Sequence, residues 1–498
     1  MRILLIFAFL NIICLNKTKG QDVQNVKILN ADKTYADSKK HPEYWRLINN
    51  VIFTHNNTFM YCDSAYHYSK KDKIIAFGKI KINQGDSIIV TGKKLTYVSG
   101  RNTAIIEGDV KLIDKNMLLE TNRINYNLKT NIASYPNKGK ITESEKVINS
   151  IKGSYHSNIH TFIFKDSVKV LAQDYTINTD NMHYDTQNEI AYFYGPSKII
   201  SNNKIIYCEN GWYNTITDKS QFKNNAYLLS NSYILKGDSL YYSKNDMYAK
   251  AIGHVAIIDT IENIILNGGI AEYFEDHEKA IIKEKPILNL ILENDTLFMH
   301  AKKFINFQHK GSEKILAYNK VKMYKSDFQG KCDSLTYIYK DSIIEMHKSP
   351  IIWSNNFQIT SDTIQFVIHK NKIDKMYLNS NPILISKEDS IDYNQISGKK
   401  MISHFNNNKI TRTKVLGNGE TIFISKDEND KKIGITYLQS SDLTLYFKNN
   451  KLNNISYLIQ PNSETIPIDK VSEDDRYLTG FKWRGAERPM SKEEIFKE

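Results

Sequence analysis

The chain has 498 residues, of which 24% are charged and 41% are apolar, and its formal net charge is +12. This balance is typical of a folded protein and excludes a disordered chain. Tyrosine occurs 31 times, and aromatic residues suit the pleated surface of a β-sheet. The excess of lysine could attract phosphate groups or an anionic membrane surface. It could equally be plain composition, because no basic block stands out.

The first 20 residues are typical of a secretion signal. Arg2 supplies the positive start and residues 3–15 form an apolar stretch that is too short to span a bilayer. We expect cleavage after Gly20, which makes the mature chain an exported protein. Cys14 leaves a lipid-modified N-terminus as an alternative, although Ile13 stands where lipoprotein signals use a small residue. After the signal, residues 21–50 are polar and are expected to form an N-terminal linker.

A tyrosine recurs every 29 residues in the first half of the chain, and a column of glycine, asparagine and aspartate keeps the same spacing. Self-similarity at such a period predicts a stacked repeat, in which each unit contacts mainly its neighbours. The first column is Tyr68, Tyr97, Tyr126, Tyr155, Tyr184, Tyr213 and Tyr242, and the second is Gly108, Asn137, Asp166, Gly195, Asn224 and Gly253.

Each unit is predicted to contain two strands joined by turns, for example residues 88–97 and 103–112. In the second of these, Ile106, Val110 and Leu112 alternate with charged residues, which is the period of a strand with one buried face. We predict an all-β fold: an elongated repeat of antiparallel strands with about thirteen units. Regular units occupy 51–290, looser units 291–460, and a polar tail 461–498. One strand of each unit is expected in each of two facing sheets around an apolar interior.

Patterns for catalysis and metal binding are absent from the sequence. It contains no His-Glu-x-x-His, Gly-x-Ser-x-Gly, Cys-x-x-Cys or phosphate-binding glycine loop. Paired carboxylates on a β-solenoid can make a polysaccharide lyase or hydrolase, but nothing singles out such a pair. Three cysteines remain after the signal, Cys62, Cys208 and Cys332. They cannot all pair with one another and are predicted to be small buried residues. We therefore predict no enzyme, no metal site and no cofactor.

Three segments and the tail resemble the OstA-like proteins of Bacteroidota. The segments are TFMYCDSAY at 58–66, FGKIKINQGD at 77–86 and EGDVKL at 107–112, and the tail reads EDDRYLTGFKWR at 473–484. These proteins are relatives of the LptA bridge protein and of the periplasmic domain of LptD, which move lipopolysaccharide to the outer membrane. The resemblance covers roughly residues 28–490. It implies a β-jellyroll or β-taco with a lipid-lined groove.

The resemblance further implies a periplasmic, non-enzymatic protein, with association with the outer membrane as an option. It would bind lipopolysaccharide or another acylated lipid and carry or bridge it toward that membrane. Partners would be lipopolysaccharide-transport proteins, or a second copy, joined by pairing of edge strands; no nucleic acid is expected. The residues expected to line the groove are Leu95, Ile106, Val110, Leu112, Leu240, Val255 and Ile257. The alternative is a structural solenoid with a packed dry core that binds partners through its sheet edges.

Overall fold

A computed structural model describes most of the chain and divides it into two compact units, residues 1–173 and 174–498. The predicted signal at 1–20, with Cys14 and the cleavage position after Gly20, lies outside the described residues. The described ranges are 26–37, 39–55, 58–84, 88–201, 204–230, 233–259, 261–293, 295–309, 311–406, 409–448 and 451–497.

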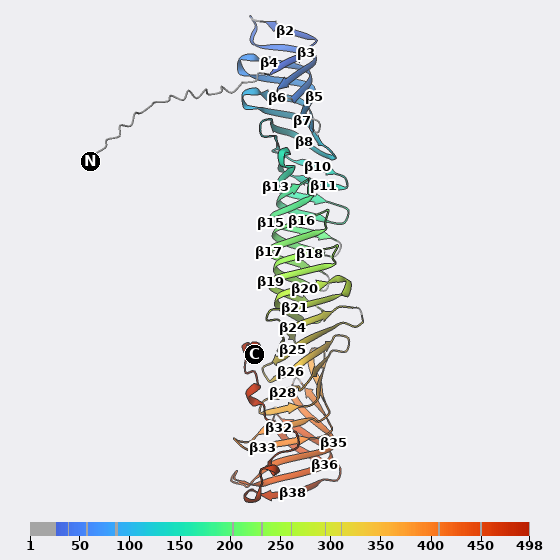
Figure 1. The fold of residues 1–498 in the computed structure, drawn as a ribbon, viewed down its shortest axis with the longest axis vertical. Helices are drawn as coiled ribbons and strands as arrows, with labels where there is room; N and C mark the ends of the chain where they lie inside the picture. The colour runs from blue at the N-terminus through green and yellow to red at the C-terminus, as the bar shows by residue number, and fades with distance from the viewer. Residues whose placement is uncertain are drawn as a thin grey trace, which may run out of the picture. The chain divides into compact units, whose positions relative to one another are not determined.

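In unit 1 the strands are β1 (Lys27–Asn30), β2 (Lys33–Asp37), β3 (His41–His55), β4 (Thr58–Tyr68), β5 (Lys73–Gln84), β6 (Ile88–Val98), β7 (Thr103–Asp114), β8 (Met117–Asn127), β9 (Ile132–Tyr135), β10 (Gly139–Glu143), β11 (Lys146–Ser150), β12 (Lys152–His156) and β13 (Thr161–Leu171) (Figure 1). Short 3-10 turns are η1 (Ser69–Lys71), η2 (Ser99–Arg101) and η3 (Ser157–Ile159).

In unit 2 the strands are β14 (Thr176–Asp185), β15 (Ile190–Ser201), β16 (Lys204–Asn214), β17 (Lys219–Leu229), β18 (Tyr233–Ser243), β19 (Tyr248–Asp259), β20 (Ile264–Phe274), β21 (Lys279–Lys283), β22 (Ile287–Ile291), β23 (Thr296–His300), β24 (Lys303–Phe307), β25 (Lys314–Tyr324), β26 (Phe328–Ile338), β27 (Ile343–His347), β28 (Ile351–Ser354), β29 (Phe357–Thr360), β30 (Thr363–His369), β31 (Lys372–Asn379), β32 (Ile383–Lys387), β33 (Tyr393–Ser397), β34 (Lys400–Asn406), β35 (Lys409–Lys426), β36 (Lys432–Lys448), β37 (Lys451–Tyr457) and β38 (Asn462–Pro467). Its 3-10 turns are η4 (Glu275–His277), η5 (Ile468–Lys470), η6 (Asp474–Arg476), η7 (Gly485–Glu487) and η8 (Glu493–Phe496).

The strands of each unit join antiparallel ladders in chain order. For example, β6 pairs with both β5 and β7, and β18 pairs with both β17 and β19. The strands β6 and β7 coincide within two residues with the predicted pair 88–97 and 103–112. The prediction of an all-β repeat of antiparallel strands is confirmed. Among the described residues, no helix is long and apolar enough to cross a bilayer.

The two sheets are built differently from the prediction. The two strands of one unit are neighbours in the ladder, so the expectation of one strand per sheet is wrong. Instead, each long strand bends in its middle and contributes one half to each sheet. Where long strands give way to short ones, the halves are separate: β8 pairs with β9 through residues 125–127 and with β10 through residues 117–121. We call the halves that carry the tyrosine column sheet 1, and the halves that carry Leu112 and Ile257 sheet 2.

The glycine, asparagine and aspartate column marks the corners between the two sheets. Pairing along β7 and β8 is irregular between Glu107 and Val110, and the intervening Gly108 and Asp109 have φ of +80° and +47°. Left-handed backbone strains most residues but not glycine, and only mildly asparagine or aspartate. The spacing of 29 residues therefore records one corner per pair of strands.

Replacing a corner glycine by alanine is expected to destabilise unit 2. Gly253 has φ of +73°, and a Cβ added there would lie 2.2 Å from Oδ2 of Asp238. Backbone strain and this clash together should lower the free energy of unfolding by about 1–3 kcal/mol in Gly253→Ala. Urea denaturation checks the loss. Gly100 serves as the control, because a Cβ there meets nothing within 4 Å and its φ is not in the left-handed range. An equal loss in Gly100→Ala would contradict the corner explanation.

The interior of unit 1 is a packed apolar core. Side chains from both sheets meet there, and Leu95, Ile106, Val110 and Leu112 are each at most 1% exposed. The prediction for the cysteines is confirmed, since Cys62, Cys208 and Cys332 are buried and free. Burial raises the pKa of each thiol to about 12, which leaves these groups protonated and unreactive near neutral pH.

In unit 2 the last strand is followed by an extended segment that returns along the outside of the ladder. β38 still pairs with β36, within the region expected to be a polar tail. Residues 468–497, which we call the C-terminal strap, then run back across sheet 2. Leu478, Phe481 and Trp483 of the strap pack against a buried outer cluster that includes Ile385 and Ile422.

Candidate functional site

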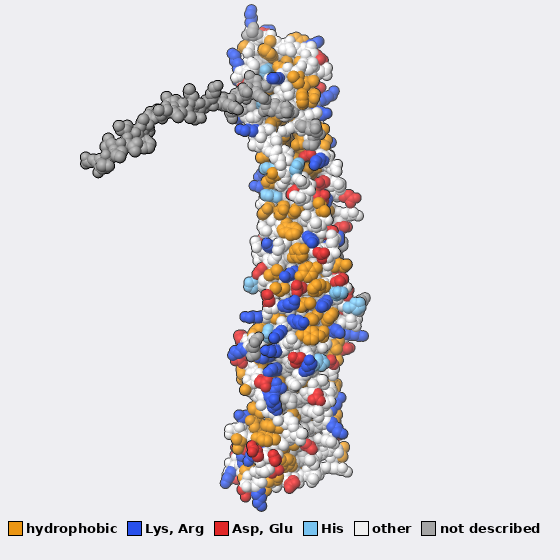
Figure 2. Space-filling view, viewed as in Figure 1, with side chains coloured by type: hydrophobic (Ala, Val, Ile, Leu, Met, Phe, Trp, Pro, Cys, Tyr) orange, Lys and Arg blue, Asp and Glu red, His pale blue; other side chains and the backbone are white. Residues whose placement is uncertain are grey.

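The seam between the two sheets is closed in unit 1 and partly open in unit 2. Tyr68 is half-buried and lies one residue out of the row, because His67 takes its place in the register. From Tyr97 onward the tyrosine column is buried at Tyr97, Tyr126, Tyr155 and Tyr184, but it is only half-buried at three successive positions. Those positions are Tyr213, Tyr242 and Tyr273. The column is buried again at Tyr337, which the strand register connects to Tyr273 through Ala280, Asn306 and Ile315. Figure 2 shows hydrophobic side chains at the surface of unit 2 over β17 to β21.

A matching column on sheet 2 opens over the same stretch. Leu112, Ile141 and Val170 are at most 4% exposed. Ile199, Leu228 and Ile257, which continue the column at 29-residue steps, are half-buried. We call this part of unit 2, from Ile199 to Tyr273, the open seam. Inward side chains of both sheets become more exposed over the same stretch. The space between the two sheets is therefore open there.

Tyrosine hydroxyls reach across the seam in unit 1 but not in the open seam. Tyr97 hydrogen-bonds His55 on sheet 2, and Tyr155 donates to Asp114 on sheet 2 at 2.5 Å. In the open seam, Tyr213 donates to Asp218 at 2.8 Å and Tyr242 donates to Glu275 at 3.3 Å. Both of these acceptors lie in turns beside sheet 1. Of these four hydrogen bonds, the two in unit 1 join one sheet to the other, and the two in the open seam stay beside sheet 1.

An alanine replaces an inward phenylalanine on sheet 1 in the open seam, and further alanines surround it. One inward row carries Phe193 and Phe222 and then Ala251 at 29-residue steps, and the neighbouring strand places Ala271 directly beside Ala251. The adjacent row places Ala249 and Ala280 on either side of Tyr273. The row of Ala251 and Ala271 regains a large side chain at Ile282, which pairs with Ala271 and is fully buried. Ala251 therefore leaves empty the space that a phenylalanine ring fills at Phe193 and Phe222 in the same column.

A cavity of about 110 Å³ fills this space. Ala251, Ala271 and Ala280 of sheet 1 face Leu228, Leu235 and Ile257 of sheet 2 across it. We call it the Ala251 cavity. Its lining is mainly apolar and can hold apolar groups with good packing.

The polar groups of the Ala251 cavity lie at its rim. Lys204, Tyr233, Glu275 and Gln308 contribute to the lining there. Burial raises the pKa of Tyr233, as it does those of Tyr242 and Tyr273, so these hydroxyls stay neutral. A ligand with an apolar chain and a polar or anionic head could therefore place the chain inside and the head near Lys204.

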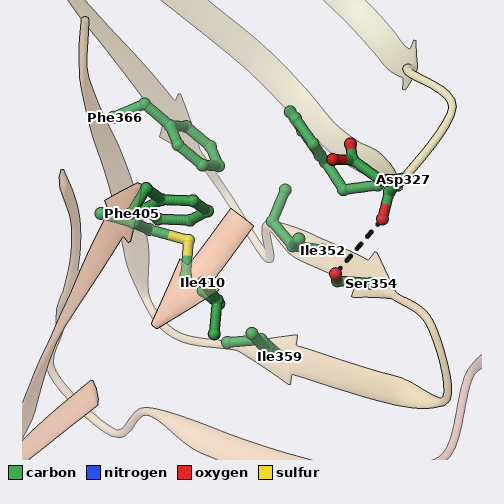
Figure 3. A pocket seen from close by; sticks show the side chains of 9 residues that line it. Asp327, Ile352, Ser354, Ile359, Phe366, Phe405 and Ile410 are labelled. Atoms are coloured by element: carbon green, nitrogen blue, oxygen red, sulfur yellow. Dashed lines mark hydrogen bonds between the residues drawn. The ribbon is translucent and has the colours of Figure 1, made fainter. Parts of the chain in front are cut away.

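A second interior cavity, near the C-terminal end of unit 2, is far smaller. It measures about 20 Å³. Ile352 and Ile359 point into it from sheet 2, while Phe366, Phe405 and Ile410 point into it from sheet 1 (Figure 3). Asp327 lies at its margin, where its backbone carbonyl accepts a hydrogen bond from Ser354. This void is a packing gap about the size of one water molecule, and it shows that large side chains normally fill the space between the sheets.

The seven residues predicted to line a groove occupy two different environments. Leu95, Ile106, Val110 and Leu112 lie in the packed core of unit 1. Leu240 and Val255 are also buried, at 7% and 1% exposure, within the ladder that forms the open seam. Only Ile257 of the seven lines the Ala251 cavity.

The alanines of sheet 1 form the part of the site that the sequence-based prediction missed. Their signal was present in the sequence, because an inward column of aromatic residues changes to alanine at position 251. Among the described residues, no three histidine, cysteine, aspartate or glutamate side chains gather as metal ligands.

The sequence matches a known family over its N-terminal part. The model of the OstA-like protein family matches residues 23–180 and 176–238. Residues 23–238 are OstA-like. This OstA-like region contains all of unit 1 from β1 onward and the strands β14 to β17 of unit 2. No curated protein matches the chain.

The OstA-like region ends inside the open seam. Leu228 and Leu235 lie within it, whereas Ala251, Ile257 and Ala271 follow it. The same ladder continues without a break, since β18 pairs with β17 and β19 pairs with β18. The Ala251 cavity is therefore built jointly by OstA-like strands and by the strands stacked directly onto them.

Proposed function

We propose that this OstA-like protein is a non-catalytic lipid-binding protein of the periplasm. It holds an acyl chain between its two sheets and carries or bridges lipopolysaccharide toward the outer membrane. The observation that carries the proposal is the Ala251 cavity, an apolar space at an open seam with Lys204 at its rim. Each methylene group buried there contributes about 0.8 kcal/mol. The predicted secretion signal at 1–20 supports export to the compartment where such lipids move.

The two units have different roles in lipid binding. The open seam of unit 2 admits the acyl chain. The packed core of unit 1 and the tyrosine hydrogen bonds between its two sheets support a second candidate function, which is a structural role. Docking would use the ends of the ladders, where β1 and β2 pair with β3, and β37 and β38 pair with β36. A strand from a lipopolysaccharide-transport protein or from a second copy could add there through backbone hydrogen bonds.

A photoreactive amino acid at Ile257 tests the lipid proposal in intact cells. Ile257 faces the cavity, so irradiation is expected to attach lipopolysaccharide to the protein, which shifts its mobility on a gel and is detected by antibody to the lipid. Position Val110 is tested in parallel, because it belongs to the predicted groove but is 1% exposed. An adduct at Ile257 alone places the lipid in the open seam, and adducts at both positions extend the path into unit 1. Absence of any lipid adduct at Ile257 would contradict the proposal.

A further inference from the structure

The outer face of sheet 2 carries one continuous row of directly paired residues along unit 2. Ile257 and Leu235 face the cavity, so their chain neighbours Ile258 and Ile234 point to the opposite side of the sheet. Each residue of the row is paired with the next by the strand register. The row is Ile200, Ile205, Leu229, Ile234, Ile258, Ile265, Asn289, Phe298, Tyr324, Gln329, Trp353, Gln358, Ile385, Gln395, Ile422 and Tyr437.

The C-terminal strap covers one end of this row. The side chain of Gln395 donates to the carbonyl of Arg476 at 2.7 Å and accepts from the amide of Leu478 at 2.8 Å. Gln358 holds the carbonyl of Lys482 and the amide of Arg484 in the same way, at 2.7 and 2.6 Å. Both glutamines are fully buried. The carboxamides thus bind the strap as a peptide backbone, and the apolar members of the row bind its side chains.

The cover extends to Phe298 and His300. Arg488 donates to Gln329 at 2.6 Å, Lys492 lies 4.2 Å from the ring centre of Phe298, and Phe496 packs on His300 at 4.7 Å. Beyond Phe298 the row continues with Asn289, whose Oδ1 is buried and has no hydrogen-bond partner among the described groups.

Six aliphatic residues follow Asn289 without cover from the strap, and we call them the outer stripe. They are Ile200, Ile205, Leu229, Ile234, Ile258 and Ile265. Leu229 is 37% exposed and the other five are half-buried. Six strands about 4.8 Å apart span about 24 Å, which an extended segment of about seven residues can cover.

A parallel outer row gives the stripe aromatic and basic neighbours. Tyr207 and Tyr227 stack at 5.2 Å between ring centres, and they are flanked in the register by Lys198 and Lys236. Both lysines are exposed. The same row continues to His300, Lys322 and Lys331, which contact the strap. The uncovered surface therefore offers apolar and basic contacts like those that hold the strap, and Asn289 at its edge offers one carboxamide.

We propose that the outer stripe is a docking surface for an extended segment of a partner polypeptide. The segment lies across the strands as the C-terminal strap does. It places aliphatic or aromatic side chains on the six residues of the stripe, carboxylates near Lys198 and Lys236, and a backbone amide at the carboxamide of Asn289. The continuity of the row with the strap's own binding surface favours a peptide over a lipid. This surface is separate from the Ala251 cavity, so it can stand or fall independently of lipid binding.

Crosslinking from position 258 and a binding titration together test the docking surface. A photoreactive amino acid at Ile258 of the full chain, in its own cells, is expected to capture one segment of one polypeptide, identified by mass spectrometry. A synthetic peptide of that segment, carrying a fluorophore, is then titrated against purified protein by fluorescence anisotropy. Ile234→Asp should weaken its binding at least tenfold.

Ile252→Asp is the matched control, because Ile252 lies on the same strand as Ile258, is 43% exposed and points outward from sheet 1. It is expected to leave the affinity for the peptide within twofold of the unmodified protein. Thermal melting of both variants confirms that they are folded. A lipid adduct, an adduct with a second copy of the chain, adducts scattered over unrelated proteins, no adduct, or equal losses in the two variants would overturn the proposal.

Discussion

Ala251→Phe is expected to weaken acyl-chain binding about sixtyfold while leaving the fold intact. The substitution restores the aromatic ring that the same column carries at Phe193 and Phe222, which are at most 4% exposed. The new ring fills a cavity of about 110 Å³ whose floor includes Ala251 and Ala271. If it displaces three methylene groups of the ligand, the loss is about 2.4 kcal/mol, or about sixtyfold in affinity.

Titration with a fluorescent fatty acid, followed by competition with lipopolysaccharide, measures this loss. Ile252→Phe is the matched control, because it adds the same ring to the next residue of β19 on the outer face of sheet 1. It should leave the affinity unchanged. Urea denaturation of Ala251→Phe is expected to show equal or higher stability, since the ring gains contacts in a space that was empty. Unchanged lipid affinity in a folded Ala251→Phe variant would show that the cavity is not the binding site.

The repeat was predictable because it depends on local geometry. An inward tyrosine, a corner residue that tolerates left-handed backbone and alternating aliphatic residues must recur once per pair of strands. Gly108 and Gly253 lie at the same position of the 29-residue period, and in the structure both lie at a corner between the two sheets. The pairing of halves into two sheets was not predictable from the period alone. It depends on how sharply each strand bends at its corner. The period gives the position of the corner in the sequence but not the geometry of the bend.

The candidate site was predictable in kind but not in position. Columns of aliphatic residues indicated an apolar seam, and Ile257 does line the Ala251 cavity. The same pattern at Ile106 and Leu112 gives a packed core, because there the opposite sheet supplies large side chains. A column of aliphatic residues fills a packed core or lines a cavity according to the size of the side chains that face it from the opposite sheet. That size depends on residues such as Ala271 and Ala280, which belong to other strands.

The C-terminal strap was hidden for a different reason. Phe481, Trp483 and Phe496 have no periodic neighbours, so the sequence indicated only isolated aromatic residues in a polar tail. Their partners lie far away in the chain: Phe481 and Trp483 pack on Tyr393, and Phe496 packs on His300. Such contacts follow from the stacking of the whole ladder, which brings these outer rows into line beneath the strap.

Gln358→Ala is expected to release the central part of the strap and to lower the stability of unit 2. The carboxamide of Gln358 is fully buried and satisfies the carbonyl of Lys482 and the amide of Arg484. Without it, two backbone groups lose their partners beneath a covered surface, at about 1–3 kcal/mol each. Partial access of water reduces the sum, so we expect a loss of about 2–4 kcal/mol in the free energy of unfolding.

Amide hydrogen exchange separates release of the strap from a general loss of stability. Exchange at Arg484 should quicken in Gln358→Ala by more than it does at Ile422, which lies in the sheet beneath the strap. Gln365→Ala is the control, since Gln365 is a half-buried glutamine whose side chain donates to Glu345 at 3.0 Å. Its loss should stay within about 0.5 kcal/mol. If Arg484 exchanged equally in both variants, the carboxamide would not hold the strap. The row of carboxamides on sheet 2 would then not be a peptide-binding surface.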